Sequence, residues 1–158
     1  MMSVRCSDFI RHATLAGVLT LMAAPALAGP VIEDAWVRAV PPVSDSTAGY
    51  FLLRNEGEED LVLTGFEADI VEAGEMHTWA DGEDGTRHMQ RLDEVSISAG
   101  EEVRFRSGGK HLMLFRLTDP LEAGDHHELC LEFAEAETVC ADFEVRRDED
   151  EGHDHHDH

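Results

Sequence analysis

Positive charge is scarce in this chain. Its 12 lysines and arginines stand against 34 aspartates and glutamates, which gives a formal net charge of −22 at pH 7. A surface of this sign repels phosphate backbones, so we do not expect the protein to bind nucleic acid. The charge favours solubility, attraction of cations and partners with basic patches. A general solvated acidic surface also accounts for most of these carboxylates without a specific role.

Long hydrophobic runs are absent after the N-terminus. The apolar residues 13–24 follow Arg5 and Arg11 and precede a small-residue cleavage signal at 26–28. This run is shorter than the roughly 20 apolar residues that a membrane span needs. We therefore expect residues 1–28 to be a cleaved signal peptide, with a single membrane anchor as the alternative. The mature protein is expected in an oxidising compartment, a bacterial periplasm, without membrane insertion.

Cysteine is also rare, with three in the chain. Cys6 would leave with the signal peptide, so Cys130 and Cys140 would remain as an even pair. Both fall on the polar face of adjoining strand-like runs, where they can pair across a hairpin. An oxidising compartment favours a disulfide, and closing a loop of about 11 residues would stabilise the fold by roughly 3 kcal/mol. Metal binding by the pair is the alternative.

Helical periodicity is missing from the mature chain. Short strand-like runs separated by proline, glycine, asparagine and aspartate predict a β-sandwich or barrel. The length allows one domain, which we place at residues 29–147. The expected strands cover residues 35–40, 49–53, 60–65, 73–79, 101–106, 111–117, 128–134 and 138–145.

Motifs for nucleophilic catalysis are absent as well. The sequence has no G-x-S-x-G motif, and it offers no pair of carboxylates in a setting that suggests acid and base catalysis. We therefore do not expect an enzyme.

Four residues near the middle of the chain do indicate a chemistry: His77, Met89, His111 and Met113. Two imidazoles and two thioethers form a ligand set that suits Cu(I), since thioether sulfur is a soft ligand. His111 and Met113 are two residues apart on a predicted strand, so they share one face with their bases about 6.5–7 Å apart. His77 lies in another strand-like run. Met89 follows a turn, so we expect it on a loop.

The spacing of these four residues resembles the signature of the periplasmic copper chaperone family PCu(A)C, H(M)-x10-M-x21-H-x-M. Eleven residues separate His77 from Met89, twenty-one separate Met89 from His111, and one separates His111 from Met113. The optional methionine after the first histidine is Thr78 here. The resemblance extends to most of the mature chain, at residues 34–38 (DAWVR), 41–42 (PP), 48–51 (AGYF), 55 (N), 108–113 (GGKHLM), 120–121 (PL) and 124–125 (GD).

The resemblance implies an all-β, cupredoxin-like Greek-key barrel or sandwich. It also implies that the four residues bind Cu(I) and that the protein transfers it to a cuproprotein, notably the binuclear copper centre of cytochrome c oxidase or one of its assembly factors. Trp79 and Met76 are candidate neighbours of the ion, and ordinary packing is equally compatible with Trp79.

Two other functions compete with a chaperone. An electron-transfer cupredoxin needs a cysteine thiolate beside two histidines, and no cysteine lies near His77 or His111 in the sequence. A periplasmic copper or zinc buffer or resistance protein, without a dedicated acceptor, stays open.

The C-terminal residues 148–158 are acidic and rich in histidine. This composition is typical of a disordered segment and of metal binding. Imidazole and carboxylate together suit Cu(II), Zn(II) or Ni(II). We expect the tail to capture Cu(II), and an affinity tag is the alternative. Its candidate ligands are His153, His155, His156 and His158.

Overall fold

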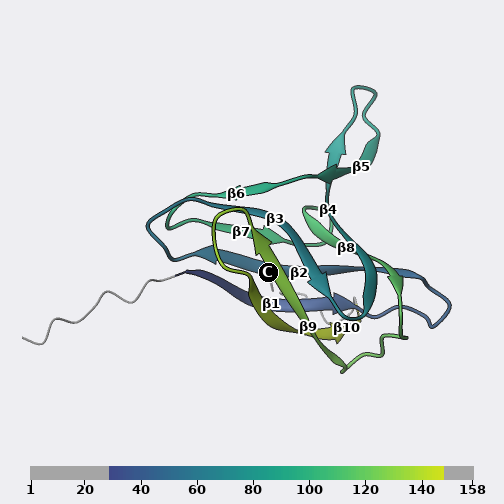
Figure 1. Cartoon of the computed structure of the whole chain (residues 1–158). Coiled ribbons are helices and arrows are strands. Elements are labelled where there is room, and N and C mark those ends of the chain that lie inside the picture. The colour runs from purple at the N-terminus through teal and green to yellow at the C-terminus, as the bar shows by residue number, and fades with distance from the viewer. Residues whose placement is uncertain (1–28, 148–158) are drawn as a thin grey trace, which may run out of the picture.

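The structure, a computed structural model, describes residues 29–147 as an all-β domain (Figure 1). The expected signal peptide and the histidine-rich tail lie outside the described residues. Within the described range there is no helix that is long and apolar enough to cross a membrane. The strands are β1 (Pro30–Arg38), β2 (Ser46–Asn55), β3 (Leu61–Ala68), β4 (Val71–Asp81), β5 (Arg87–Leu92), β6 (Val95–Ile97), β7 (Glu102–Phe105), β8 (His111–Leu117), β9 (His126–Phe133) and β10 (Val139–Arg146).

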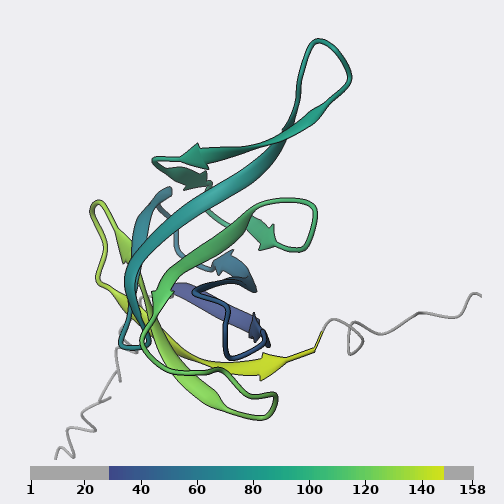
Figure 2. The same ribbon diagram turned by 90° about the vertical axis from the view of Figure 1, so that its right-hand side faces the viewer.

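The strands form one hydrogen-bonded sheet in the order β5-β4-β8-β2-β1-β10-β9-β3-β6, with β7 paired to β2. Neighbouring strands are antiparallel except for β1 and β10, which run parallel. The sheet curls around a shared hydrophobic core, as the view along the molecule shows (Figure 2). This architecture confirms the all-β expectation.

Strand β8 separates two environments because successive side chains on a strand point to opposite faces. Leu112 and Leu114 are fully buried in the main core. Met113 packs on the other face, against a small cluster made by Trp36, Ala48 and Tyr50. The alternation therefore gives β8 a core face and a second, polar and sulfur-bearing face.

Two strands, β5 and β6, were not expected from the sequence. The expectation that Met89 lies on a loop is wrong, because Met89 is within β5. The side chains of β5 are exposed on both faces apart from Leu92, so its sequence shows no alternation of buried and exposed residues. The strand forms because it pairs along its length with β4. The sequence of β5 by itself does not indicate this pairing.

The hairpin of β4 and β5 extends away from the body of the domain (Figure 2). Its turn is closed by a hydrogen bond from the amide of Gly82 to the carbonyl of Thr86 at 2.7 Å. Gly85 has a φ of 80°, a left-handed conformation that glycine adopts without steric cost. This turn returns the chain so that β5 runs beside the strand that carries His77.

Candidate metal centre

The pairing of β4 with β8 brings the two histidines together. His77 and His111 are directly opposite each other in the antiparallel register, and their ring centroids are 6.0 Å apart. Met113 lies two residues further along β8, opposite Glu75 of β4 and Ala48 of β2. The cross-strand pairs place both imidazoles and one thioether on the same face of the sheet.

The pairing of β4 with β5 adds the second thioether to this face. Met89 is directly opposite Trp79, and Trp79 is two residues from His77 on β4, so all three share one face. Met89 and Trp79 are exposed, with 41% and 37% of their surface accessible. The edge strand therefore presents a methionine and a tryptophan to solvent beside the histidine pair.

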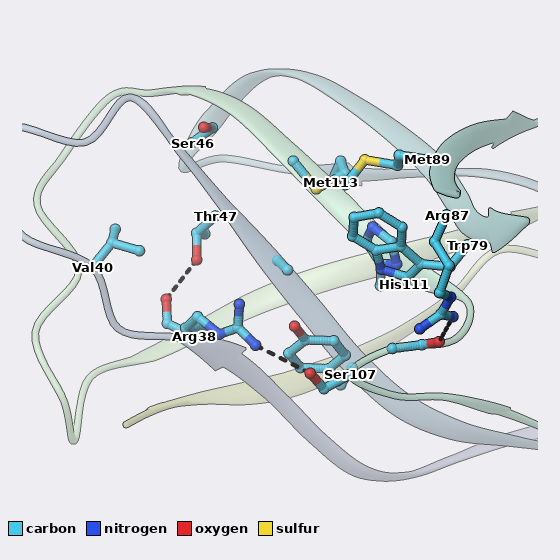
Figure 3. A pocket seen from close by; sticks show the side chains of 13 residues that line it. Arg38, Val40, Ser46, Thr47, Trp79, Arg87, Met89, Ser107, His111 and Met113 are labelled. Atoms are coloured by element: carbon cyan, nitrogen blue, oxygen red, sulfur yellow. Dashed lines mark hydrogen bonds between the residues drawn. The ribbon is translucent and has the colours of Figure 1, made fainter. Parts of the chain in front are cut away.

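An open cleft of about 590 Å³ lies over this face. Its wall includes His111, Met113, Met89 and Trp79, which Figure 3 labels among the lining residues. His77 is not part of the wall, and its side chain is 13% exposed. Three of the four candidate ligands thus line the cleft, and the fourth, His77, faces His111 across β4 and β8.

His111 is oriented by the backbone. It is 4% exposed, and its Nδ1 lies 2.9 Å from the carbonyl oxygen of Gly109. A carbonyl can only accept, so Nδ1 carries the hydrogen and Nε2 keeps a lone pair. Burial lowers the pKa of His111 below its usual value, and the hydrogen bond to Gly109 opposes this shift. The neutral imidazole, the form that binds metals, is therefore favoured.

His77 is oriented by a carboxylate. Its Nε2 lies 2.7 Å from Oε2 of Glu75, and the other oxygen of Glu75 is 3.0 Å from Nη1 of Arg91. The hydrogen bond from His77 lowers the pKa of Glu75, and Arg91 adds to this effect. The Nδ1 atom of His77 is buried and has no hydrogen-bond partner. Sequence reasoning did not find Glu75, although a carboxylate two residues before His77 shares its strand face.

Arg87 joins the projecting hairpin to the turn between β7 and β8. Its Nη2 donates a hydrogen bond to the carbonyl of Gly108 at 3.0 Å, and its guanidinium lies 5.7 Å from the centre of the Trp79 ring. Asp81 forms an ion pair with it at 3.3 Å. Arg87 thereby links both sides of the cleft (Figure 3).

Comparison with known proteins identifies the family of the chain. Residues 31–145 match the family described as "Putative lipoprotein LpqE-like". This chain belongs to the LpqE-like family. A similar protein, "Putative lipoprotein Lxx21020" from Leifsonia xyli subsp. xyli (strain CTCB07), is 29% identical over 111 residues, which cover 70% of this chain. The match spans 65% of that relative, so the chain covers less than two thirds of its length.

Solved structures with the same fold are PCuAC domains. An "Apo PCuAC domain from PmoF1" is 19% identical with a TM-score of 0.65, covering 77% of this chain and 97% of that one. A copper-bound PCuAC domain from PmoF2 is 22% identical, with a TM-score of 0.64 and coverages of 80% and 99%. The solution structure of CuI-DR1885 from Deinococcus radiodurans is 27% identical, with a TM-score of 0.63 and coverages of 79% and 83%. The resemblance to PCu(A)C proteins seen in the sequence is confirmed.

Met76 does not lie beside the candidate ligands of this LpqE-like protein. It is 3% exposed and belongs to the main core, since it points to the opposite face of β4 from His77. The expectation that Met76 borders the ion is therefore wrong. Trp79, the other candidate neighbour, shares the face of His77 and lines the cleft.

The two cysteines within the described residues of the LpqE-like domain form a disulfide. Cys130 and Cys140 are directly opposite each other on β9 and β10, and their sulfurs are bonded. Among the described residues, Glu128 is the one other potential metal ligand grouped with them. Disulfide sulfurs lack the thiolate that binds metals, so the bonded pair does not offer a metal site.

Proposed function

We propose that this protein is an extracytoplasmic copper chaperone that binds Cu(I) through His77, Met89, His111 and Met113. The observation that carries this proposal is the gathering of two imidazoles and two thioethers on one face of β5, β4 and β8. The likeness to the Cu(I) form of DR1885, at 27% identity, supports the same conclusion.

The donor set selects the oxidation state of the metal. Thioethers are soft ligands that suit Cu(I), whereas Cu(II) favours nitrogen and oxygen in a tetragonal arrangement. Neutral imidazoles and thioethers add no charge, so the bound ion keeps its single positive charge. The chain would therefore hold copper as a cargo, without a thiolate that binds it too tightly to release.

Transfer would proceed by exchange of one ligand at a time. Met89 is exposed on the edge strand β5, so an acceptor's thiolate or imidazole can displace it first. Met113 packs against Trp36, Ala48 and Tyr50, and it would leave later. We propose that the acceptor is a cuproprotein, with the binuclear copper centre of cytochrome c oxidase as the first candidate.

We also propose that the tail captures Cu(II), with His153, His155, His156 and His158 as ligands. The described chain leads to this segment from the end of β10, where the carbonyl of Arg146 accepts a hydrogen bond from the amide of Ala39 at 2.7 Å. Arg38, the neighbour of Ala39, lines the cleft. Two binding sites on one chain, when a short flexible linker joins them, meet at an effective concentration on the order of millimolar.

The test is a metal titration of the wild-type protein and of a chain ending at Arg147, under reducing and oxidising conditions. We expect one Cu(I) site in both proteins and a weaker Cu(II) site in the full chain alone. Loss of Cu(I) binding on truncation would contradict the division between domain and tail. An intense blue Cu(II) absorption would indicate an electron-transfer protein instead.

A second experiment separates a chaperone from a passive buffer. The Cu(I)-loaded protein is mixed with a soluble copper-accepting domain of cytochrome c oxidase, and copper is followed in both proteins after separation. A chaperone should transfer Cu(I) to this domain faster than a small-molecule chelator of equal Cu(I) affinity does. Equal transfer rates from the protein and from the chelator would favour a buffer.

A further inference from the structure

We propose that Glu75 is a positioning residue that makes His77 present Nδ1 to the metal, while the Gly109 carbonyl makes His111 present Nε2. The two histidines would then bind one ion through opposite ring nitrogens. This inference rests on the proposed function, because it assigns ligand atoms and a supporting residue to the same site.

The first step is the direction of the hydrogen bond between His77 and Glu75. A carboxylate without a proton can only accept hydrogen bonds. The Nε2 atom of His77 lies 2.7 Å from Oε2 of Glu75, so it is this nitrogen that carries the hydrogen in the neutral ring. The remaining lone pair is then on Nδ1.

The second step is the environment of that lone pair. Nδ1 of His77 is buried and makes no hydrogen bond, although buried polar atoms nearly always have a partner. The His77 ring neighbours those of His111 and Phe115, with ring centroids 6.0 Å and 6.1 Å away. A metal ion bound between the two imidazoles would supply the missing partner.

The third step is what holds Glu75. Its second oxygen is 3.0 Å from Nη1 of Arg91, and Arg91 is directly opposite His77 on β5. The carboxylate is thus held from both sides, by an arginine on the neighbouring strand and by the imidazole on its own strand. Carboxylates in this position fix the tautomer and orientation of metal-binding histidines, and their loss typically costs about 10–100-fold in metal affinity.

His111 provides the internal comparison. Its Nδ1 donates to the backbone carbonyl of Gly109, a contact that no side-chain substitution at position 75 removes. The backbone therefore fixes the tautomer of His111, whereas the Glu75 side chain, which can be substituted, fixes the tautomer of His77. A change at Glu75 should alter His77 and leave His111 as it is.

The test measures the tautomers of both rings in the metal-free protein by long-range proton–nitrogen NMR at alkaline pH, and Cu(I) affinity by competition with a chelator. The variant is Glu75→Gln, whose amide can donate to Nε2 and so permit the other tautomer. The matched control is Glu72→Gln, since Glu72 lies on the same strand and pairs with Arg116 at 3.0 Å.

In the wild type and in Glu72→Gln we expect the hydrogen on Nε2 of His77 and on Nδ1 of His111. In Glu75→Gln we expect the Nδ1–H form of His77 to appear and Cu(I) affinity to fall by about 10–100-fold. A wild-type His77 protonated on Nδ1, or an unchanged tautomer and affinity in Glu75→Gln, would overturn the proposal. Unchanged Cu(I) affinity in His77→Ala would instead overturn the ligand set, whatever the tautomer result.

Discussion

His77 and His111 are 34 residues apart in the sequence and face each other across β4 and β8, with ring planes inclined at 56°. Both belong to the hydrogen-bonded sheet, and each has one ring nitrogen held by a hydrogen bond. The imidazoles are therefore positioned before any metal arrives. Preorganisation of this kind reduces the ordering that binding would otherwise require.

Replacing Met113 with alanine should weaken Cu(I) binding by more than about 10-fold, because it would remove one of the four proposed ligands and not merely a supporting contact. Competition with a chelator under reducing conditions measures the change. Met76→Leu is the control, since Met76 is buried in the core next to His77 in sequence. It should keep Cu(I) affinity and lose less than about 1.5 kcal/mol of stability. Equal Cu(I) affinities for Met113→Ala and Met76→Leu would show that Met113 is not a ligand.

Replacing Arg87 with alanine should speed the release of Cu(I). The substitution removes the hydrogen bond to Gly108 and the contact with Trp79 that link the two sides of the cleft. Stopped-flow transfer to an excess of chelator measures the rate. Arg116→Ala, which removes an exposed pair with Glu72, is the control and should release copper at the wild-type rate. A rate for Arg87→Ala that matches Arg116→Ala would show that the link does not retain copper.

Acidification should destabilise the metal-free protein through His111. Burial lowers the pKa of His111 below 6.5, so the unfolded chain binds a proton that the folded state resists. This contribution to stability is complete above the unfolded pKa and is lost as the pH falls through the lower folded pKa. The free energy of unfolding, measured in urea between about pH 7 and pH 5, should change less with pH for His111→Gln than for the wild type. An equal pH dependence in both proteins would show that His111 is not the cause.

The pKa of Glu75 produces an effect at lower pH. The hydrogen bond from His77 lowers this pKa from 4.5, so its stabilising contribution is present above the unfolded value and is lost below it. The loss attributed to His111 begins first during acidification, because it starts near the unfolded value of 6.5 and that of Glu75 near 4.5. The two groups can therefore be separated by the pH range in which His111→Gln and Glu75→Gln differ from the wild type.

Removing the disulfide should lower stability without affecting the candidate metal centre. The bond between Cys130 and Cys140 joins residues 10 apart in sequence, and a loop of this size contributes about 3 kcal/mol in the chain-entropy estimate. The double change to serine should lower the free energy of unfolding by this amount in urea. Cu(I) affinity should be retained, since β9 and β10 carry none of the four candidate ligands. A parallel loss of affinity would link the hairpin to the site.

Much of the local arrangement follows from the alternation of side chains along single strands. Leu112 and Leu114 point to the core while His111 and Met113 point away, as their spacing of two residues predicts. Cys130 and Cys140 likewise share the face predicted for them and are opposite each other. These features were predictable because the period of two is a property of any extended strand.

Other features depend on which strands become neighbours. Met76 and His77 are adjacent in sequence, yet only the packed sheet decides which face of β4 is the core and assigns Met76 to it. Met89 could not be assigned to a strand from its own neighbours, because β5 is exposed on both faces and takes its form from pairing with β4.

By itself, the sequence predicted the four candidate donors, their spacing and a shared strand face for the two cysteines, with metal binding by the cysteines left open, since these depend on residue type and on separation along the chain. Only the tertiary structure decided that His77 meets His111 and that Glu75 lies between His77 and Arg91. The physical reason is that these contacts join strands far apart in sequence. Their register is set by the curled sheet and its core, which no local pattern specifies.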